Sequence, residues 1–264
     1  MITYVDGRAT GYDDVGAGIP VLFLHGFPHN RALWAPQLGA LATPARTLCM
    51  DLRGFGDSEP GETNGMDRYA DDAAALLDLL GIERVVLAGL SMGGYVALAF
   101  WRRHRARVRA LVLCDTRATA DTDAARAARQ AMQALVLEQG STAVANQMIP
   151  GMVGRTTRNK NPELVDELHR MMSLAPVVGV VGALDALMTR PDSTSTLATI
   201  DVPTLIVVGD EDALTPVPDA RALHLAIAGS RLEVIAGAGH VSNMERPATF
   251  NHVLSEFLVS LTAQ

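Results

Sequence analysis

Residues 85–101 read VVLAGLSMGGYVALAFW, and no charged side chain interrupts these seventeen positions. The run approaches the shortest length that spans a membrane, but its centre is GLSMGG at 89–94. A buried strand, a tight turn and a buried helix account for this pattern better than a membrane helix does. The stretch therefore predicts a strand–turn–helix unit at the centre of a sheet, with no membrane as partner.

Apolar runs within this unit and on both sides of it predict the strands. They lie at 20–24, 46–50, 84–88, 110–114, 203–208 and 232–235. Most are apolar throughout, which is typical of parallel strands that helices cover on both faces. Residues 2–15 predict an antiparallel hairpin with its turn near Asp6 and Gly7.

Helical patterns alternate with these runs. Apolar residues recur at three- and four-residue steps between 66 and 80, and a last amphipathic helix begins near Pro247. This alternation predicts the α/β class, with a doubly wound and mostly parallel sheet.

The segment 117–199 breaks the alternation. It reads as several helices, among them 123–138 and 162–173, without an obvious buried strand. We therefore expect a core made of 1–116 and 200–264, with 117–199 as a helical lid rather than an independent domain. The methionines at 132, 148, 152, 171, 172 and 188 lie there, either as core filler or as an adaptable apolar roof over a ligand.

The net charge of −7 argues against nucleic acid as the main partner. The basic run 102–109 follows a helical pattern, so it is interpreted as a set of cations at a helix C-terminus, with a polyanion site as the alternative.

Cys49 and Cys114 lie inside apolar runs, and free buried thiols fit them better than a disulfide. Because residues 1–6 also lack the features of a signal peptide, we expect a cytoplasmic protein.

Gly89-Leu90-Ser91-Met92-Gly93 carries the chemistry. The G-x-S-x-G pattern between a strand and a helix predicts a nucleophile elbow, in which Ser91 occupies a strained turn between small residues. The following helix points its N-terminus at the serine, which favours developing negative charge. A serine that merely caps the helix would leave the flanking glycines unexplained.

A serine nucleophile needs a base and an acid that orients the base. His240 follows the last predicted strand and is the predicted base. Asp212, after the strand 203–208, is the predicted acid, with Asp115 and Asp210 as alternatives. The order Ser91, Asp212, His240 is the one that the G-x-S-x-G elbow leads us to expect.

Two backbone N–H groups should hold the oxyanion of the tetrahedral intermediate. Met92 directly follows the nucleophile and is expected to supply one. Phe27, in the loop after strand 20–24, is expected to supply the other, because Pro28 has no N–H group. His25 then reads as a structural residue of this loop.

Five stretches together resemble the α/β-hydrolase superfamily, in its branch of lidded esterases, lactonases and carbon–carbon bond hydrolases. They are HGFP at 25–28, DLRGFGDS at 51–58, GLSMGG at 89–94, GDEDALTP at 209–216 and GAGH at 237–240. The resemblance implies an eight-stranded sheet, a lid between strands six and seven and the triad named above. A serine at 91 speaks against the dehalogenase and epoxide-hydrolase members, which have an aspartate there.

The substrate is less defined. RPDST at 190–194 is similar to enol-lactone hydrolases, whereas HGFP is commoner in esterase-like members. An apolar roof without evident arginine clamps favours a small to medium, largely neutral ester or lactone. Residues near the motifs are candidates to contact it: Pro28, Trp34, Met148, Leu214 and Val241.

Three functions compete at this point. A carboxylesterase or lactonase is expected first, and a carbon–carbon hydrolase with the same triad or a small-molecule receptor on this fold are the alternatives. We find no pattern for a metal or an organic cofactor, and a small molecule is the expected partner. The sequence does not decide between a monomer and a homodimer.

Overall fold

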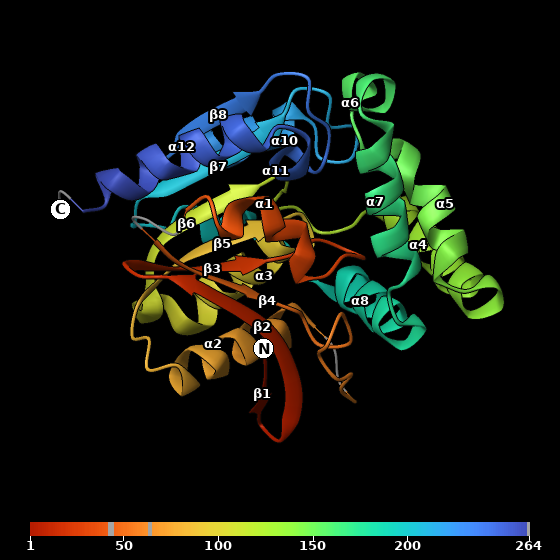
Figure 1. The fold of residues 1–264 in the computed structure, drawn as a ribbon, viewed down its shortest axis with the longest axis horizontal. Coiled ribbons are helices and arrows are strands. Elements are labelled where there is room, and N and C mark those ends of the chain that lie inside the picture. Colours follow the sequence, from red (N-terminus) through yellow and green to blue (C-terminus); the bar gives the residue numbers. More distant parts are fainter. Residues whose placement is uncertain (42–44, 63–64, 263–264) are drawn as a thin grey trace.

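The structure is a computed structural model that describes residues 1–41, 45–62 and 65–262. Eight strands form one sheet in the order β1-β2-β4-β3-β5-β6-β7-β8 (Figure 1). They are β1 (Ile2–Val5), β2 (Arg8–Gly16), β3 (Ile19–Leu24), β4 (Ala45–Met50), β5 (Val85–Leu90), β6 (Val108–Cys114), β7 (Thr204–Gly209) and β8 (Arg231–Ile235). Strand β2 pairs antiparallel with β1 and β4, and the remaining pairs are parallel. The predicted fold class is confirmed.

Helices cover both faces of this sheet, as the wholly apolar strands require. Helices α2 (Met66–Leu79), α3 (Met92–His104) and α10 (Val217–Ala226) contribute to one core, and α1 (Ala35–Leu38) and α12 (Pro247–Ser260) lie on the other face (Figure 1). Along β5, Val85 and Leu87 belong to the first core, whereas Val86 and Ala88 belong to the second. The two-residue period of a strand thus divides one apolar run between two cores.

The winding of the sheet creates the place for a site. Strand β3 lies between β4 and β5 in the sheet. From β3 the chain therefore passes to β4 on one side, and then crosses to β5 on the other side of β3. The segments that leave the carboxyl ends of β3 and β5 therefore diverge to opposite sides and open a crevice between them. Phe27 follows β3 and Ser91 follows β5, so both lie at this crevice.

Six helices occupy the connection between β6 and β7. They are α4 (Asp123–Gln139), α5 (Ser141–Met152), α6 (Arg155–Lys160), α7 (Pro162–Ser173), α8 (Val177–Thr189) and α9 (Thr194–Leu197). Their starts follow local chemistry: the Thr122 side chain accepts from Ala125 N–H at α4, and Asn161 does the same for Leu164 N–H at α7. Helices α4 to α8 stand together beside the sheet, within the segment predicted as a lid (Figure 1).

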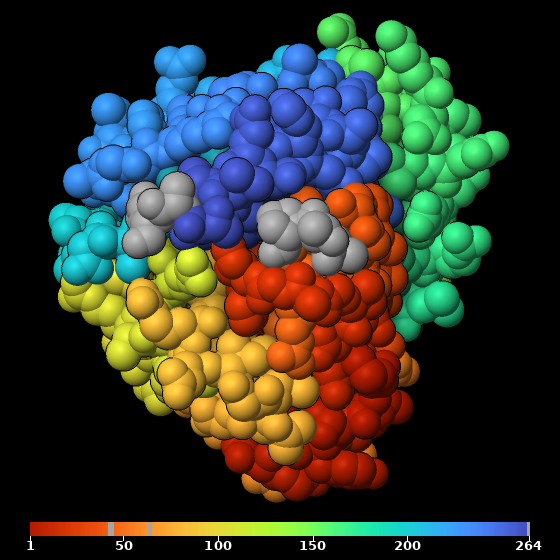
Figure 2. Space-filling model, turned by 60° about the vertical axis from the view of Figure 1, so that its left-hand side comes forward, coloured from red at the N-terminus to blue at the C-terminus, as the bar shows by residue number. Residues whose placement is uncertain are grey.

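The two ends of the core meet on one face of the molecule. Figure 2 shows the N-terminal segments in red against the C-terminal segments in blue, with the lid helices in green to one side. Helix α1 packs on α12, which joins these two parts of the chain. Cys49 and Cys114 are buried free thiols, as the sequence predicts.

None of the described helices alone has the length and apolar character of a membrane span. Among the described helices, only α7 and α8 taken together reach the length and apolar character of a membrane span, and they are bent by 92° at the break between them.

Candidate active site

Ser91 lies between β5 and α3 in a strained backbone conformation, with φ 54° and ψ −112°. A non-glycine residue in such a conformation costs about 1–3 kcal/mol and persists only where its surroundings hold it. Two hydrogen bonds do so: Ser91 N–H donates to Cys114 O at 2.9 Å, and Thr116 Oγ1 donates to Ser91 O at 2.8 Å. The predicted elbow therefore has the geometry that its sequence pattern indicates.

The glycines around the elbow are required by close packing. A Cβ on Gly93 would overlap the backbone carbonyl of Leu24 at the end of β3. A Cβ on Gly89 would overlap the carbonyl of Gly93 itself. Because backbone atoms cannot move aside as flexible side chains do, neither position accepts a larger residue without displacing a strand or the helix.

We expect Gly93→Ala to destabilise the protein by about 3 kcal/mol, since overpacking against fixed atoms is costly. Gly39→Ala is the matched control, because a Cβ on Gly39 meets nothing within 4 Å and its φ is −87°. That control should be neutral or stabilising by about 0.5 kcal/mol. Urea unfolding measures both, and equal stability of the two variants would refute the packing argument.

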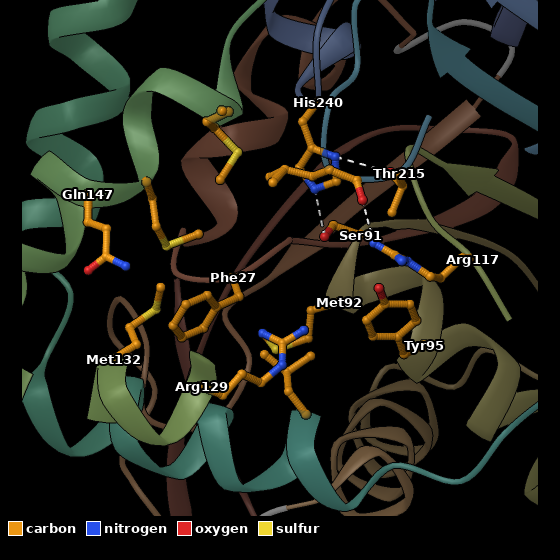
Figure 3. Close-up of a pocket in the computed structure, with 15 residues that line it drawn as sticks. Phe27, Ser91, Met92, Tyr95, Arg117, Arg129, Met132, Gln147, Thr215 and His240 are labelled. Atoms are coloured by element: carbon orange, nitrogen blue, oxygen red, sulfur yellow. Dashed lines mark hydrogen bonds between the residues drawn. The ribbon is translucent and has the colours of Figure 1, made fainter. Parts of the chain in front are cut away.

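His240 joins the elbow to an acid. Its Nε2 lies 2.8 Å from Ser91 Oγ (Figure 3). Its Nδ1 lies 2.8 Å from Asp212 Oδ2. His240 follows β8 and Asp212 follows β7, so the three carboxyl ends of β5, β7 and β8 supply one residue each. The structure thus brings the three predicted triad residues together in hydrogen-bond contact.

Backbone and side-chain donors fix the Asp212 carboxylate. Its Oδ1 accepts from the N–H groups of Leu214 at 2.8 Å and Thr215 at 3.0 Å. Its Oδ2 accepts from Thr215 Oγ1 at 2.7 Å in addition to facing His240. Asp210, one alternative acid, instead accepts from Gly237 N–H at 2.6 Å and holds the turn before His240.

Asp115, the other alternative, has a different role in the geometry. Its Oδ1 accepts from Gly209 N–H at 2.9 Å, and its Oδ2 accepts from Ser242 Oγ at 2.6 Å. The side chain thereby connects the segment that leads to Asp212 with the segment that follows His240. Burial and the nearby charge of Asp212 raise the pKa of Asp115 to about 8.

The acid and the base shift each other's pKa. Burial lowers the pKa of His240, but the charge of Asp212 and the hydrogen bond to it outweigh burial and raise this pKa above the ordinary 6.5. Burial raises the pKa of Asp212, but the charge and hydrogen bond of His240 outweigh it and hold this pKa below the ordinary 3.8. The geometry therefore favours an ionised Asp212 beside a histidine that binds a proton more readily than usual.

The loop after β3 passes directly beside the nucleophile. A Cβ built on Gly26 would lie 3.3 Å from Ser91 Cβ, and both Phe27 and Met92 line the adjoining pocket. Among residues 1–41, 45–62 and 65–262, neither the Phe27 nor the Met92 N–H donates a hydrogen bond to another group of the chain. Both amides are thus free to bind a ligand oxygen.

His25 stabilises this loop. Leu52 N–H donates to His25 Nε2 at 3.0 Å, so Nδ1 carries the proton and donates to Gly26 O at 2.9 Å. Burial lowers the pKa of His25, which keeps this arrangement neutral. The geometry agrees with the structural role expected from the sequence.

Ser91 and His240 border a pocket of about 290 Å³ (Figure 3). Its wall combines residues of the core with residues of the lid helices: Phe27, Ser91, Met92, Tyr95, Arg117, Arg129, Met132, Gln147, Met148, Gly151, Met152, Leu187, Leu214, Thr215 and His240. Met148 and Leu214, both predicted contacts, are among them. Three lid methionines, at 132, 148 and 152, also line the pocket, whereas Met171 and Met172 are buried in the core.

Three predicted contacts lie elsewhere. Trp34 is fully buried, with its ring centroid 4.8 Å from that of Phe23 and 6.0 Å from that of Phe250, so it packs between β3 and α12. Pro28 and Val241 are buried too, and neither is part of the pocket wall. Pro28 and Val241 directly follow Phe27 and His240 in the sequence, and this adjacency did not bring their side chains to the pocket.

The expectation of a pocket without arginines is wrong. Arg117 and Arg129 both line it (Figure 3). Arg117 could have been found, because it follows the carboxyl end of β6, the edge where the site lies. Arg129 carries no sequence signal, since it is one of several arginines on a lid helix whose position over the sheet the sequence does not give.

Glu245 is another residue without a motif. Its carboxylate accepts from Gly154 N–H of the lid at 2.9 Å and from Gly239 N–H, next to the predicted base, at 2.7 Å. Nearby, His240 N–H donates to Met152 O at 3.0 Å. These bonds fasten one end of the lid to the loop that carries His240. Among the residues that the structure describes, no group of three or more His, Cys, Asp or Glu side chains is placed to hold a metal ion.

Known proteins share this fold and these sequence features. A model of the alpha/beta hydrolase fold family matches residues 19–247. A thermophilic esterase from Thermogutta terrifontis, solved with malate bound, is 38% identical with a TM-score of 0.95, covering 98% of this chain and 97% of that one. The 3-oxoadipate enol-lactonase 2 of Acinetobacter baylyi is 30% identical over 89% of this chain and 86% of its own. The 2-hydroxymuconate semialdehyde hydrolase of a Pseudomonas species is 28% identical over 97% of this chain and 93% of its own.

Proposed function

The chain belongs to the α/β-hydrolase fold family, and on that premise we propose that it is a serine hydrolase that cleaves carboxylic esters or lactones through an acyl-enzyme on Ser91. What supports this function above all is the unbroken hydrogen-bonded chain from Asp212 through His240 to Ser91, at the floor of a pocket. The esterase and enol-lactonase among the relatives support the same bond class.

In the proposed mechanism Ser91 Oγ attacks the carbonyl carbon while His240 Nε2 accepts the hydroxyl proton. The N–H groups of Phe27 and Met92 bind the oxyanion, and each such donor is worth about 3–4 kcal/mol of barrier. His240 then gives its proton to the leaving alcohol, and the acyl group stays on Ser91. Water activated by the same histidine releases the acid and restores the serine.

The pH dependence follows from the base. Only neutral His240 accepts the serine proton, and its pKa lies above the ordinary 6.5, so kcat/KM should fall as pH drops, with a midpoint above 6.5. In Asp212→Asn the charge that raises this pKa is gone, so the midpoint of the residual activity should move to lower pH. Rates of p-nitrophenyl butyrate hydrolysis from about pH 5 to about pH 9 test this. A wild-type midpoint well below 6.5 would contradict it.

Pocket size limits the acyl group. A pocket of about 290 Å³ is at the small end for ligand sites, so acetyl and butyryl esters should react faster than octanoyl esters. Hydrolysis of p-nitrophenyl acetate, butyrate and octanoate by the wild type measures this profile. Phe27→Ala and Met148→Ala should shift the optimum toward longer chains, and an unchanged optimum in both variants would refute the assignment of this pocket.

A carbon–carbon hydrolase with the same three residues is the second candidate. The relative named 2-hydroxymuconate semialdehyde hydrolase favours keeping it. Turnover of vinylogous diketones, together with no turnover of any ester, would select this function over ester hydrolysis.

A further inference from the structure

The pocket wall is electrostatically one-sided. Apart from His240, its charged side chains are Arg117 and Arg129, and no aspartate or glutamate is among the described residues that line it. Most of the remaining wall is apolar, with phenylalanine, leucine and methionine side chains. A positive charge that faces a mostly apolar pocket attracts an anion and repels a cation.

Arg129 is held rigidly at this wall. Its Nε and Nη2 donate to the carboxylate of Asp121, whose side chain is only 5% exposed. Arg190 Nη1 donates to the same carboxylate at 2.7 Å, and the Arg190 guanidinium lies 4.3 Å from the centroid of the Tyr95 ring. Two guanidinium groups thus share the carboxylate of Asp121.

Arg117 is less completely bonded. Its Nη2 donates to Leu214 O, but its buried Nε has no hydrogen-bond partner among the described residues. Nε lies 3.6 Å from Asp219 Oδ2, which is too long for a hydrogen bond. Arg117 therefore forms an ion pair with Asp219 while its guanidinium borders the pocket.

Both guanidiniums border the same pocket as Ser91. Figure 3 shows the Arg129 side chain directed toward the middle of the pocket and Arg117 on another part of its wall. A ligand with its carbonyl at Ser91 would extend from there into the space that they border. A planar fork of N–H donors matches a carboxylate in shape and charge.

We propose that Arg129, assisted by Arg117, binds a free carboxylate of the substrate, so that the preferred substrates are half-esters of dicarboxylic acids or lactones that bear a carboxylate. This replaces the neutral substrate expected from the sequence, and it rests on the proposed hydrolase function.

The test compares two esters with acyl chains of equal length, the p-nitrophenyl half-ester of glutaric acid and p-nitrophenyl pentanoate. The wild type should have a kcat/KM at least about tenfold higher for the half-ester. Arg129→Gln should lower that preference by roughly 10- to 100-fold, and Arg117→Gln by less, in line with the loss of a charged hydrogen bond. Spontaneous hydrolysis of the half-ester is measured with Ser91→Ala and subtracted.

Arg126→Gln is the matched control. Arg126 lies on the same helix and bonds to Asp121 O and Asp123, but it does not line the pocket. Arg126→Gln removes the same charge from α4 as Arg129→Gln does. Because Arg126 does not line the pocket, the variant should leave the ratio of kcat/KM for the two esters unchanged. A wild type that prefers the pentanoate, or an Arg129→Gln variant that loses both esters equally, would overturn the proposal.

A binding measurement separates this proposal from the hydrolase function. Glutarate should bind to Ser91→Ala in a calorimeter, and the added change Arg129→Gln should weaken that binding at least about tenfold. If the wild type hydrolyses no ester but glutarate binds in this pattern, the carboxylate subsite is supported and the proposed ester hydrolysis is refuted. If esters react and glutarate binds equally well with and without Arg129, the subsite falls and the hydrolase function stands.

Discussion

Ser91→Ala is expected to lower kcat for ester hydrolysis by roughly 10⁴- to 10⁶-fold, the largest single effect in the protein. The variant loses the atom that forms the acyl bond, while the Phe27 and Met92 amides and the pocket remain. What activity persists should come from those amides and from binding alone. Initial rates with p-nitrophenyl butyrate measure the loss.

The fold should survive this change. The hydrogen bonds that hold the elbow are made by the Ser91 backbone and not by its hydroxyl, whose contact is with His240. Thermal unfolding should therefore stay close to the wild type. Ser195→Ala, at an exposed position on α9, is the control and should keep full activity. A folded Ser91→Ala variant with activity within tenfold of the wild type would rule out Ser91 as the nucleophile.

Asp212→Asn is expected to lower kcat by about 10⁴-fold. The asparagine oxygen would still accept from the N–H groups of Leu214 and Thr215, so its amide NH₂ would face His240 Nδ1. Nδ1 would then accept a hydrogen bond rather than donate one, and the ring proton would sit on Nε2. A histidine protonated at Nε2 cannot take the proton of Ser91.

The alternative acids supply the controls. Asp210 bonds to the turn at Gly237 and not to the histidine, so Asp210→Asn should keep kcat within about fivefold. Asp115→Asn should weaken the connection between the two catalytic loops and reduce activity by an intermediate factor. If Asp115→Asn cost as much as we expect for Asp212→Asn, while Asp212→Asn cost little, the acid would have to be reassigned to Asp115.

Much of this site could be predicted because each part of it is local. The glycines around Ser91 reflect contacts within a short strand–turn–helix unit, and His240 and Asp212 each directly follow a buried strand. In a parallel sheet all such strand ends meet at one edge, so sequence order alone brings them together. The helices at 162–173 and from Pro247 were likewise set by a proline at their first position and by an apolar stripe.

The pocket wall could not be predicted in the same way. Arg129 lies on α4, and the position of α4 beside the pocket depends on its packing against α5 and α8. The prediction that Trp34 contacts the substrate was wrong for a related reason. A single turn of 3₁₀ helix from Arg31 to Trp34 directs the Trp34 ring into the core. Glu245 joins the lid to the loop of His240 through backbone N–H groups, and such contacts leave no mark in the sequence.

Covalent labelling of the nucleophile tests the central claim most directly. The wild type is incubated with diisopropyl fluorophosphate, and residual ester hydrolysis is compared with the mass and position of the adduct. We predict one phosphoryl group per chain, on the peptide that contains Ser91, with activity falling in proportion to labelling. Activity that persists after complete labelling of Ser91, or that disappears while the adduct lies on another residue, would contradict a Ser91 acyl-enzyme.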